Sequence, residues 1–208
     1  MKWQISHGRL CALCVRRLRR DKLRHKSGFA APCVAGHEQK EIFIWDCLFK
    51  KKDAAPSFPV VLAADAAGAF VKMEDIPDEV FAQGILGQGC GIDPSEGKVY
   101  APCDGEITQA PDTLHAFGIT TPGGVEVLIH VGVDTVEMKG DGFESKVKLG
   151  SKVTKGQLLL TMDLDKIKAA GHPAVVITVV TNTDDFASVD VVASGNVNPG
   201  DDMMKVNK

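Results

Sequence analysis

Two histidines lie at matched positions on either side of a dipeptide typical of turns, and together they could bind one tetrahedral group. His115 and His130 belong to apolar, strand-like segments that flank Pro122-Gly123, and the simplest topology for such segments is an antiparallel hairpin. If the hairpin is symmetric about that dipeptide, His115 lies directly opposite His130, with Cβ atoms about 4.5–5.5 Å apart on one face. A symmetric loop of two or four residues keeps this pairing. A longer or asymmetric loop could shift it by one residue, which would put the two rings on opposite faces.

A structural role for the two histidines stays open, because a histidine in a strand is more often structural than catalytic. The functional chemistry that fits such a pair is phosphoryl transfer. A neutral imidazole is a nucleophile that can accept a phosphoryl group, and a neighbouring ring N–H can hydrogen-bond the transferred oxygens. No metal or nucleotide is needed when the donor is another phosphoprotein. A zinc hydrolase would need a third protein ligand, and His130-Val131-Gly132 lacks the H-x-H pattern. A serine-type triad lacks its G-x-S-x-G elbow.

The alternation of side chains along the two segments predicts what accompanies the histidines. On the symmetric pairing, Phe117 shares a face with His115, and Leu128 shares a face with His130. Ile119 also shares the face of His115. The side chains expected to point the other way, toward a core, are Val125, Val127, Ile129, Val131 and Val133. The histidines are therefore expected on a partly apolar outer face.

The elements that must position this pair are predicted to be short strands. From Pro59 onward, apolar segments separated by turn residues recur at intervals of about ten residues, which is typical of an all-β sandwich or barrel. Two short helices are predicted over residues 78–83 and 163–170. The glycines of residues 87–92 fail the dinucleotide-binding pattern, and no nucleotide-triphosphate phosphate loop occurs. We expect an antiparallel β-sandwich or barrel with one or two short helices.

The charge distribution divides the chain into two chemically different segments. Residues 1–52 hold 13 Lys/Arg and 4 Asp/Glu, a net charge of +9, whereas residues 53–208 hold 11 and 23, a net charge of −12. We interpret residues 1–55 as a basic, cysteine-containing, poorly ordered extension with a linker, and residues 56–208 as the functional domain. Cys11-x-x-Cys14 has no second close pair, which disfavours a zinc ribbon in the extension.

Length and composition exclude several classes of protein. The 208 residues, 44% of them apolar, suffice for one globular domain with a sizeable core. The longest apolar runs fall short of the about 18 residues that span a bilayer, and no signal-peptide pattern follows the basic start. We expect a cytoplasmic protein without direct membrane insertion, and we interpret the basic run as a solvated tail rather than a nucleic-acid site.

Several stretches of the domain form a recognisable series. They are 76–82 (IPDEVFA), 97–105, 113–117, 124–136 (GVEVLIHVGVDTV), 140–143 and 153–165. In type and order these stretches resemble the glucose-type IIA component of the bacterial phosphoenolpyruvate-dependent sugar phosphotransferase system. The resemblance runs from about Pro59 to Lys208, and its double-histidine portion is the most specific part.

The resemblance implies a phosphocarrier. Such a protein takes a phosphoryl group from the histidine-containing protein HPr and passes it to a cysteine on a sugar-specific IIB domain, which works with a membrane IIC permease. His130 matches the phosphorylated histidine, whose Nε2 attacks while the Gly132 carbonyl holds Nδ1. His115 matches the histidine that steadies the phosphoryl group, and Thr113 matches the hydroxyl that orients it.

The resemblance also implies a partner-binding face. Phe81, Phe117 and Val136 match its apolar part, with Asp78 and Asp134 as charged neighbours. Structural alternatives exist for three of them, since Phe81 and Val136 could be core residues and Asp78 could cap the short helix.

Alternatives from other classes stay open. The A-P-x-D-G pattern of residues 101–105 and the V-x-x-G-Q pattern of residues 153–157 are similar to biotinyl and lipoyl carrier domains, but no hairpin with a modifiable lysine is evident. A zinc peptidase of related β architecture is a second rival. The resemblance implies no resident cofactor, because the phosphoryl group is carried covalently. Four points stay open: whether a zinc ion is shared with a partner through His115 and His130, which sugar is taken up, whether the domain is fused to IIB or IIC, and the oligomeric state.

Overall fold

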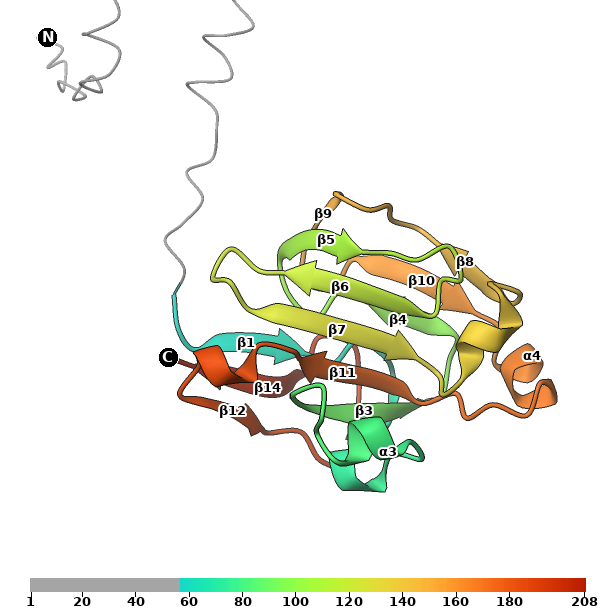
Figure 1. Ribbon diagram of the computed structural model, residues 1–208, viewed down its shortest axis with the longest axis horizontal. Helices are drawn as coiled ribbons and strands as arrows, with labels where there is room; N and C mark the ends of the chain where they lie inside the picture. Colours follow the sequence, from blue (N-terminus) through green and yellow to red (C-terminus); the bar gives the residue numbers. More distant parts are fainter. Residues whose placement is uncertain (1–56) are drawn as a thin grey trace, which may run out of the picture. The chain divides into compact units, whose positions relative to one another are not determined.

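The computed structural model describes residues 57–208, and in this part of the chain the backbone consists mainly of short strands (Figure 1). The strands are β1 (Val60–Ala63), β2 (Gly68–Val71), β3 (Gln88–Pro94), β4 (Lys98–Tyr100), β5 (Gly105–Gln109), β6 (Ala116–Thr120), β7 (Glu126–Val131), β8 (Phe143–Ser145), β9 (Lys152–Val153), β10 (Leu158–Met162), β11 (Val176–Val180), β12 (Ser188–Val191), β13 (Asn196–Val197) and β14 (Asp202–Asn207). The helical segments are the α-helices α3 (Glu79–Ala82) and α4 (Leu164–Ala169) and the 3₁₀ turns η1 (Met73–Asp75), η2 (Thr135–Met138) and η3 (Thr183–Asp185). The predicted all-β class with two short helices is confirmed.

The strands pair antiparallel in three sheets. The large sheet has eight strands in the order β13-β2-β3-β11-β7-β6-β5-β9, and the small sheets have the orders β1-β14-β12 and β4-β10-β8. Buried side chains from all three sheets belong to one main core, for example Leu62 of β1, Val99 of β4 and Ile129 of β7. The small sheets therefore pack on one face of the large sheet, as expected for a sandwich.

A second, smaller apolar cluster lies on the opposite face of the large sheet. Ile177 and Val179 of β11 contribute to it, together with Ile76, Phe81 and Val133. Figure 1 shows α3 beside β3. From α3, the Phe81 side chain packs in this cluster with Ile177 and Val179. Because β11 is buried on both faces, it is apolar along almost its whole length, as the sequence shows.

Asp78 begins helix α3 as its N-cap. Its Oδ1 accepts hydrogen bonds from the backbone N–H groups of Val80 (2.8 Å) and Phe81 (3.2 Å). Caps of this kind stabilise a helix by about 1 kcal/mol. The structural alternative considered for Asp78 is therefore confirmed, and Asp163 caps α4 in the same way.

The predicted hairpin forms, but its register differs by one residue from the symmetric pairing. Ala116 and not His115 lies opposite His130. The Thr121 N–H donates to the Val125 carbonyl at 2.9 Å, so the loop has three residues, and its last residue, Gly124, has a φ of +81°. A three-residue loop that ends in a left-handed residue is a common hairpin connection, and its odd length moves the pairing by one.

The shift in register reverses the predicted face of Phe117. Phe117 pairs with Ile129, and its side chain is 0% exposed in the main core. The prediction that Phe117 lies on an outer, partner-binding face with His115 is therefore wrong, because a one-residue slip exchanges the faces of a strand. Leu128 does share its face with His130, as expected.

Two further predictions concern segments of the chain. The basic extension of residues 1–55, with Cys11 and Cys14, lies outside the described residues, as does its boundary with the domain at residue 56. Within residues 57–208, no helix is long and apolar enough to cross a membrane.

Candidate functional site

His130 lies near the C-terminal end of β7, and the main chain fixes its ring. Its Nδ1 donates a hydrogen bond to the Gly132 carbonyl oxygen at 2.8 Å. Since a carbonyl oxygen can only accept, the proton of the neutral ring is on Nδ1, and Nε2 keeps a free lone pair. The predicted pairing of Nδ1 with Gly132 is thus present in the structure.

His115 lies immediately before β6, where the chain bends out of the strand. Leu114, which precedes it, is left-handed with a φ of +55°. The His115 carbonyl accepts a hydrogen bond from the Val131 N–H at 2.7 Å, which holds the bend against β7. The ring centroids of His115 and His130 are 5.2 Å apart, with an interplanar angle of 76°. The bend therefore brings the rings together although the strand register does not pair the two residues.

Thr113 contacts the second imidazole. Its Oγ1 lies 2.7 Å from Nδ1 of His115. When the hydroxyl donates to Nδ1, the proton of the neutral ring is on Nε2, which can then donate to a bound oxygen. Two separate hydrogen bonds, from Thr113 to His115 and from His130 to Gly132, thus orient the two adjacent rings.

Both imidazoles are biased toward the neutral form. Burial lowers the pKa of His130 below its usual value, and the neighbouring His115 lowers this pKa further. The Gly132 carbonyl and the carboxylates of Asp78 and Asp134 raise the pKa of His130, but burial has the larger effect. Burial also lowers the pKa of His115. At neutral pH both rings are uncharged, which is the form in which imidazole is a nucleophile.

Apolar side chains pack around the ring of His130. The Phe81 ring centroid lies 5.1 Å from that of His130, and Phe81 is 5% exposed. Ile177 of β11 is the cross-strand neighbour of His130 and is fully buried. The sequence analysis missed Ile177, because the apolar run around it indicated a buried strand without indicating its register against β7.

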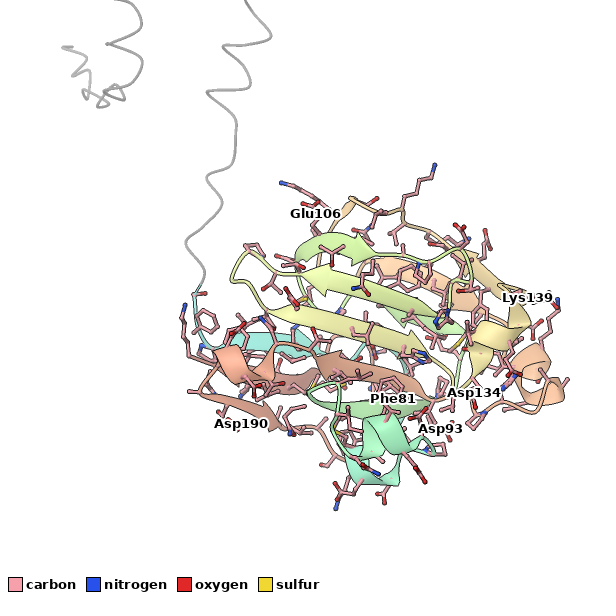
Figure 2. The ribbon with its side chains drawn as sticks, in the orientation of Figure 1. Phe81, Asp93, Glu106, Asp134, Lys139 and Asp190 are labelled. Carbon is pink, nitrogen blue, oxygen red and sulfur yellow. The ribbon has the colours of Figure 1, made fainter. Side chains whose placement is uncertain are left out.

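The residues predicted for a partner-binding face divide by burial. Val136 is 46% exposed, and Asp134 is exposed in a left-handed conformation. Asp78 is half-buried as a helix cap. Phe81 is buried in the second apolar cluster, as its structural alternative predicted, and its ring packs against that of His130. Figure 2 shows Phe81 on α3 and Asp134 beyond the C-terminal end of β7. Phe117 contributes nothing to this surface.

Three exposed apolar side chains near α3 were not identified from the sequence. They are Val80, Ile85 and Leu86, of which Ile85 is 65% exposed. A helix of four residues is too short for its apolar periodicity to separate a buried face from an exposed one. Exposed apolar groups that lie close together are typical of a protein-docking surface.

The donor set does not fit a self-contained catalytic metal site. Within residues 57–208, no group of three or more His, Cys, Asp or Glu side chains is arranged to hold a metal ion. The ring pair supplies two nitrogen ligands, and a catalytic zinc site generally uses three protein ligands.

Residues 60–186 match the family model described as phosphoenolpyruvate-dependent sugar phosphotransferase system, EIIA 1. The chain belongs to this family. It is 43% identical over 162 residues to the glucose-specific EIIA component of Halalkalibacterium halodurans, which covers 78% of this chain and 93% of that protein. It is also 49% identical over 116 residues to the glucosamine-specific EIICBA component of Bacillus subtilis, which covers 56% of this chain and 18% of that longer protein.

A solved structure has the same fold. The glucose permease IIA of Mycoplasma capricolum matches with a TM-score of 0.66 and 34% identity, over 72% of this chain and 96% of that one. This EIIA chain is therefore a phosphotransferase that carries a phosphoryl group in sugar uptake. The biotinyl or lipoyl carrier and the zinc peptidase are not favoured.

Proposed function

We propose that this EIIA chain takes a phosphoryl group from the phosphohistidine of HPr on Nε2 of His130 and gives it to a cysteine of a sugar-specific IIB domain. The hydrogen bond from His130 Nδ1 to the Gly132 carbonyl at 2.8 Å supports this proposal most directly. It leaves a single ring nitrogen with a lone pair, on an imidazole whose pKa is lowered by burial.

The first transfer exchanges one phosphorus–nitrogen bond for another. The lone pair of His130 Nε2 forms a bond to phosphorus while the bond to the HPr nitrogen breaks, and the electrons of that bond return to HPr. His130 keeps its proton on Nδ1 throughout. The Gly132 carbonyl stabilises the positive charge that the ring gains as the new bond forms.

His115 steadies the transferred group. With Thr113 donating to its Nδ1, His115 presents Nε2–H beside His130, and the 5.2 Å between ring centroids lets this N–H reach a phosphoryl oxygen. Preorganised donors of this kind act without reorganising during the reaction. Thr113 therefore orients His115, and His115 orients the phosphoryl group.

The second transfer restores the starting state. A cysteine thiolate of the IIB domain attacks phosphorus, a phosphorus–sulfur bond forms, and the phosphorus–nitrogen bond to His130 breaks with its electrons returning to Nε2. Each bond is exchanged between protein side chains, so the proposed cycle requires no resident cofactor or metal ion.

The surface around the rings supports brief docking of other proteins. Val80, Ile85 and Val136 expose apolar groups, and Asp78 and Asp134 add carboxylates beside them. Residues 53–208 carry a net charge of −12, which favours basic docking partners and makes association sensitive to salt.

The proposed site of action is the cytoplasm, beside a membrane IIC permease. The glucosamine-specific EIICBA component of Bacillus subtilis and the beta-glucoside-specific EIIBCA component of Dickeya chrysanthemi carry their A, B and C parts in one protein. Their organisation supports an equivalent partnership for this chain, with the phosphoryl group rather than the sugar as its cargo.

Intact mass spectrometry tests this function. The chain is incubated with HPr, the kinase that phosphorylates HPr, and phosphoenolpyruvate. We expect a gain of one acid-labile phosphoryl group and its loss when a IIB domain is added. His130→Gln should gain none, whereas His172→Gln, which changes a histidine outside the ring pair, should behave as the wild type. A folded chain that gains no phosphoryl group, or equal gain in folded His130→Gln, contradicts the proposal.

A further inference from the structure

The turn that follows β7 determines where the Gly132 carbonyl points. Gly132 has a φ of +74° and Asp134 a φ of +57°, so the chain turns sharply between them. The Gly132 N–H donates to the Val175 carbonyl, and the Val133 N–H donates to the Pro173 carbonyl, each at 2.9 Å. These two hydrogen bonds hold Gly132 and Val133 against the segment before β11.

Thr135 holds the other side of this turn. Its side chain is fully buried, and its hydroxyl donates a hydrogen bond to the Val131 carbonyl. Its methyl group packs so closely on Gly132 that a Cβ added at Gly132 would collide with it. Thr135 therefore bonds to the residue before Gly132 and packs against Gly132 itself.

The Thr135 hydroxyl satisfies a carbonyl at the point where the β6–β7 ladder ends. The last ladder pair is Ala116 with His130, and beyond it the Val131 N–H donates to the His115 carbonyl. Because the chain bends at His115, the Val131 carbonyl takes its hydrogen bond from Thr135. Val131 is fully buried, so removal of the hydroxyl would leave a buried carbonyl without this donor and free it to rotate toward another.

We propose that Thr135 is a positioning residue for the phosphoryl acceptor, whose buried hydroxyl holds the Val131–Gly132 backbone so that the Gly132 carbonyl stays on Nδ1 of His130. Through that carbonyl, Thr135 keeps the ring proton on Nδ1 and leaves Nε2 free. The inference rests on the proposed function for its transfer readout, but the position of the ring proton is a property of the unphosphorylated protein.

Two substitutions separate the hydroxyl from the rest of the side chain. Thr135→Val keeps the shape and removes the hydroxyl, whereas Thr135→Ser keeps the hydroxyl and removes the methyl group. Nitrogen-15 NMR of the full chain reports which ring nitrogen of His130 carries the proton. We expect Nδ1–H in the wild type and in Thr135→Ser. In Thr135→Val we expect a mixture with Nε2–H and phosphoryl acceptance slower by about tenfold or more.

A matched control lies at the other end of β11. The Thr183 hydroxyl donates to the Val180 carbonyl at 2.6 Å, which is the same kind of bond outside the site. Thr183→Val should lower stability without changing the His130 ring proton or the rate of phosphoryl acceptance. If the His130 ring proton moves in Thr135→Val but not in Thr183→Val, the movement is not a general effect of losing a hydroxyl–carbonyl hydrogen bond.

The proposal is overturned if folded Thr135→Val keeps the proton on Nδ1 and accepts phosphate at the wild-type rate. It is also overturned if Thr135→Ser loses the Nδ1–H preference, because the methyl group would then carry the effect. If Thr135→Val does not fold, Thr135→Ala compared with Thr135→Ser decides on the same readouts. If the wild type accepts no phosphoryl group, the proposed function fails, and the ring-proton comparison still decides the role of Thr135.

Discussion

His130 and His115 are held by different kinds of group, and this difference assigns them different tasks. A main-chain carbonyl, which can only accept, binds Nδ1 of His130, whereas a hydroxyl, which can donate, contacts Nδ1 of His115. The first ring therefore presents a lone pair on Nε2, and the second can present an N–H. In the proposed function, the first ring is the nucleophile and the second stabilises the transferred group.

We predict that His115→Gln accepts a phosphoryl group but passes it on poorly. Its discharge to a IIB domain should slow by on the order of 10²-fold, because one preorganised donor to the phosphoryl oxygens is lost. Single-turnover charging by phospho-HPr and discharge to IIB, measured separately, check this division. Equal loss of charging in His115→Gln and His130→Gln would show that the two rings do not differ in role.

The rate of phosphoryl acceptance should fall in acid with a midpoint below pH 6.5. Protonation of Nε2 removes the nucleophilic lone pair, and burial lowers the pKa at which this happens from the usual 6.5 of histidine. Protonation of the two rings also opposes folding, because burial lowers their pKa in the folded state. This part of the stability is therefore present above pH 6.5 and is lost as pH falls. A pH profile of charging under single-turnover conditions tests this, and a midpoint above 6.5 contradicts it.

At the scale of elements, two turns at opposite ends of β7 control the site. The loop before β7 sets its register against β6, and the turn after β7 aims the Gly132 carbonyl at His130. Both turns use a glycine of positive φ, Gly124 at +81° and Gly132 at +74°. Their surroundings differ, because a Cβ added at Gly124 meets no atom within 4 Å, whereas one at Gly132 meets Thr135 and Pro173.

These two glycines provide a matched pair of substitutions. Gly124→Ala should cost about 1 kcal/mol of stability through its backbone conformation alone. Gly132→Ala should cost more and should also slow phosphoryl acceptance, because the new methyl group displaces Thr135 and the carbonyl that binds His130. Chemical denaturation and single-turnover charging measure the two effects. Equal losses in both variants would contradict the role given to the turn after β7.

The hairpin also shows where prediction from the sequence reaches its limit. Alternating apolar residues and a Pro-Gly signal were enough to predict two paired strands. The sequence Pro122-Gly123-Gly124 is compatible with loops of even or odd length, since either glycine can adopt a positive φ, and the odd loop shifted the register and buried Phe117. The rings meet because of the left-handed Leu114, a conformation that a leucine rarely adopts and that no local pattern indicates.

At the scale of the whole molecule, the all-β class followed from the spacing of apolar segments, but one feature of the core did not. Asp65 is fully buried, and its Oδ2 accepts a hydrogen bond from the Thr178 hydroxyl. Its Oδ1 has no hydrogen-bond partner among residues 57–208. Burial raises the pKa of Asp65 from the usual 3.8 to about 6, against the smaller effect of the Thr178 hydrogen bond. A lone aspartate between alanines carries no signal of burial in the sequence.

Asp65 should make the chain less stable as pH rises from about 3.8 to 6. The folded state binds this proton more tightly than the unfolded state, so the neutral carboxyl favours folding and its ionisation opposes it by up to about 3 kcal/mol. Denaturation of the wild type and Asp65→Asn between pH 4 and pH 7 tests this. The variant should become relatively more stable with rising pH, and a difference that stays constant over this range would refute the assignment.

The central claim is that Nε2 of His130 carries the phosphoryl group while Nδ1 keeps its proton. NMR of the nitrogen-15-labelled chain after charging by phospho-HPr measures this directly through phosphorus–nitrogen coupling. The account predicts coupling to Nε2 of His130, with the Nδ1 proton retained. Coupling to Nδ1 of His130, or to either nitrogen of His115, would contradict it.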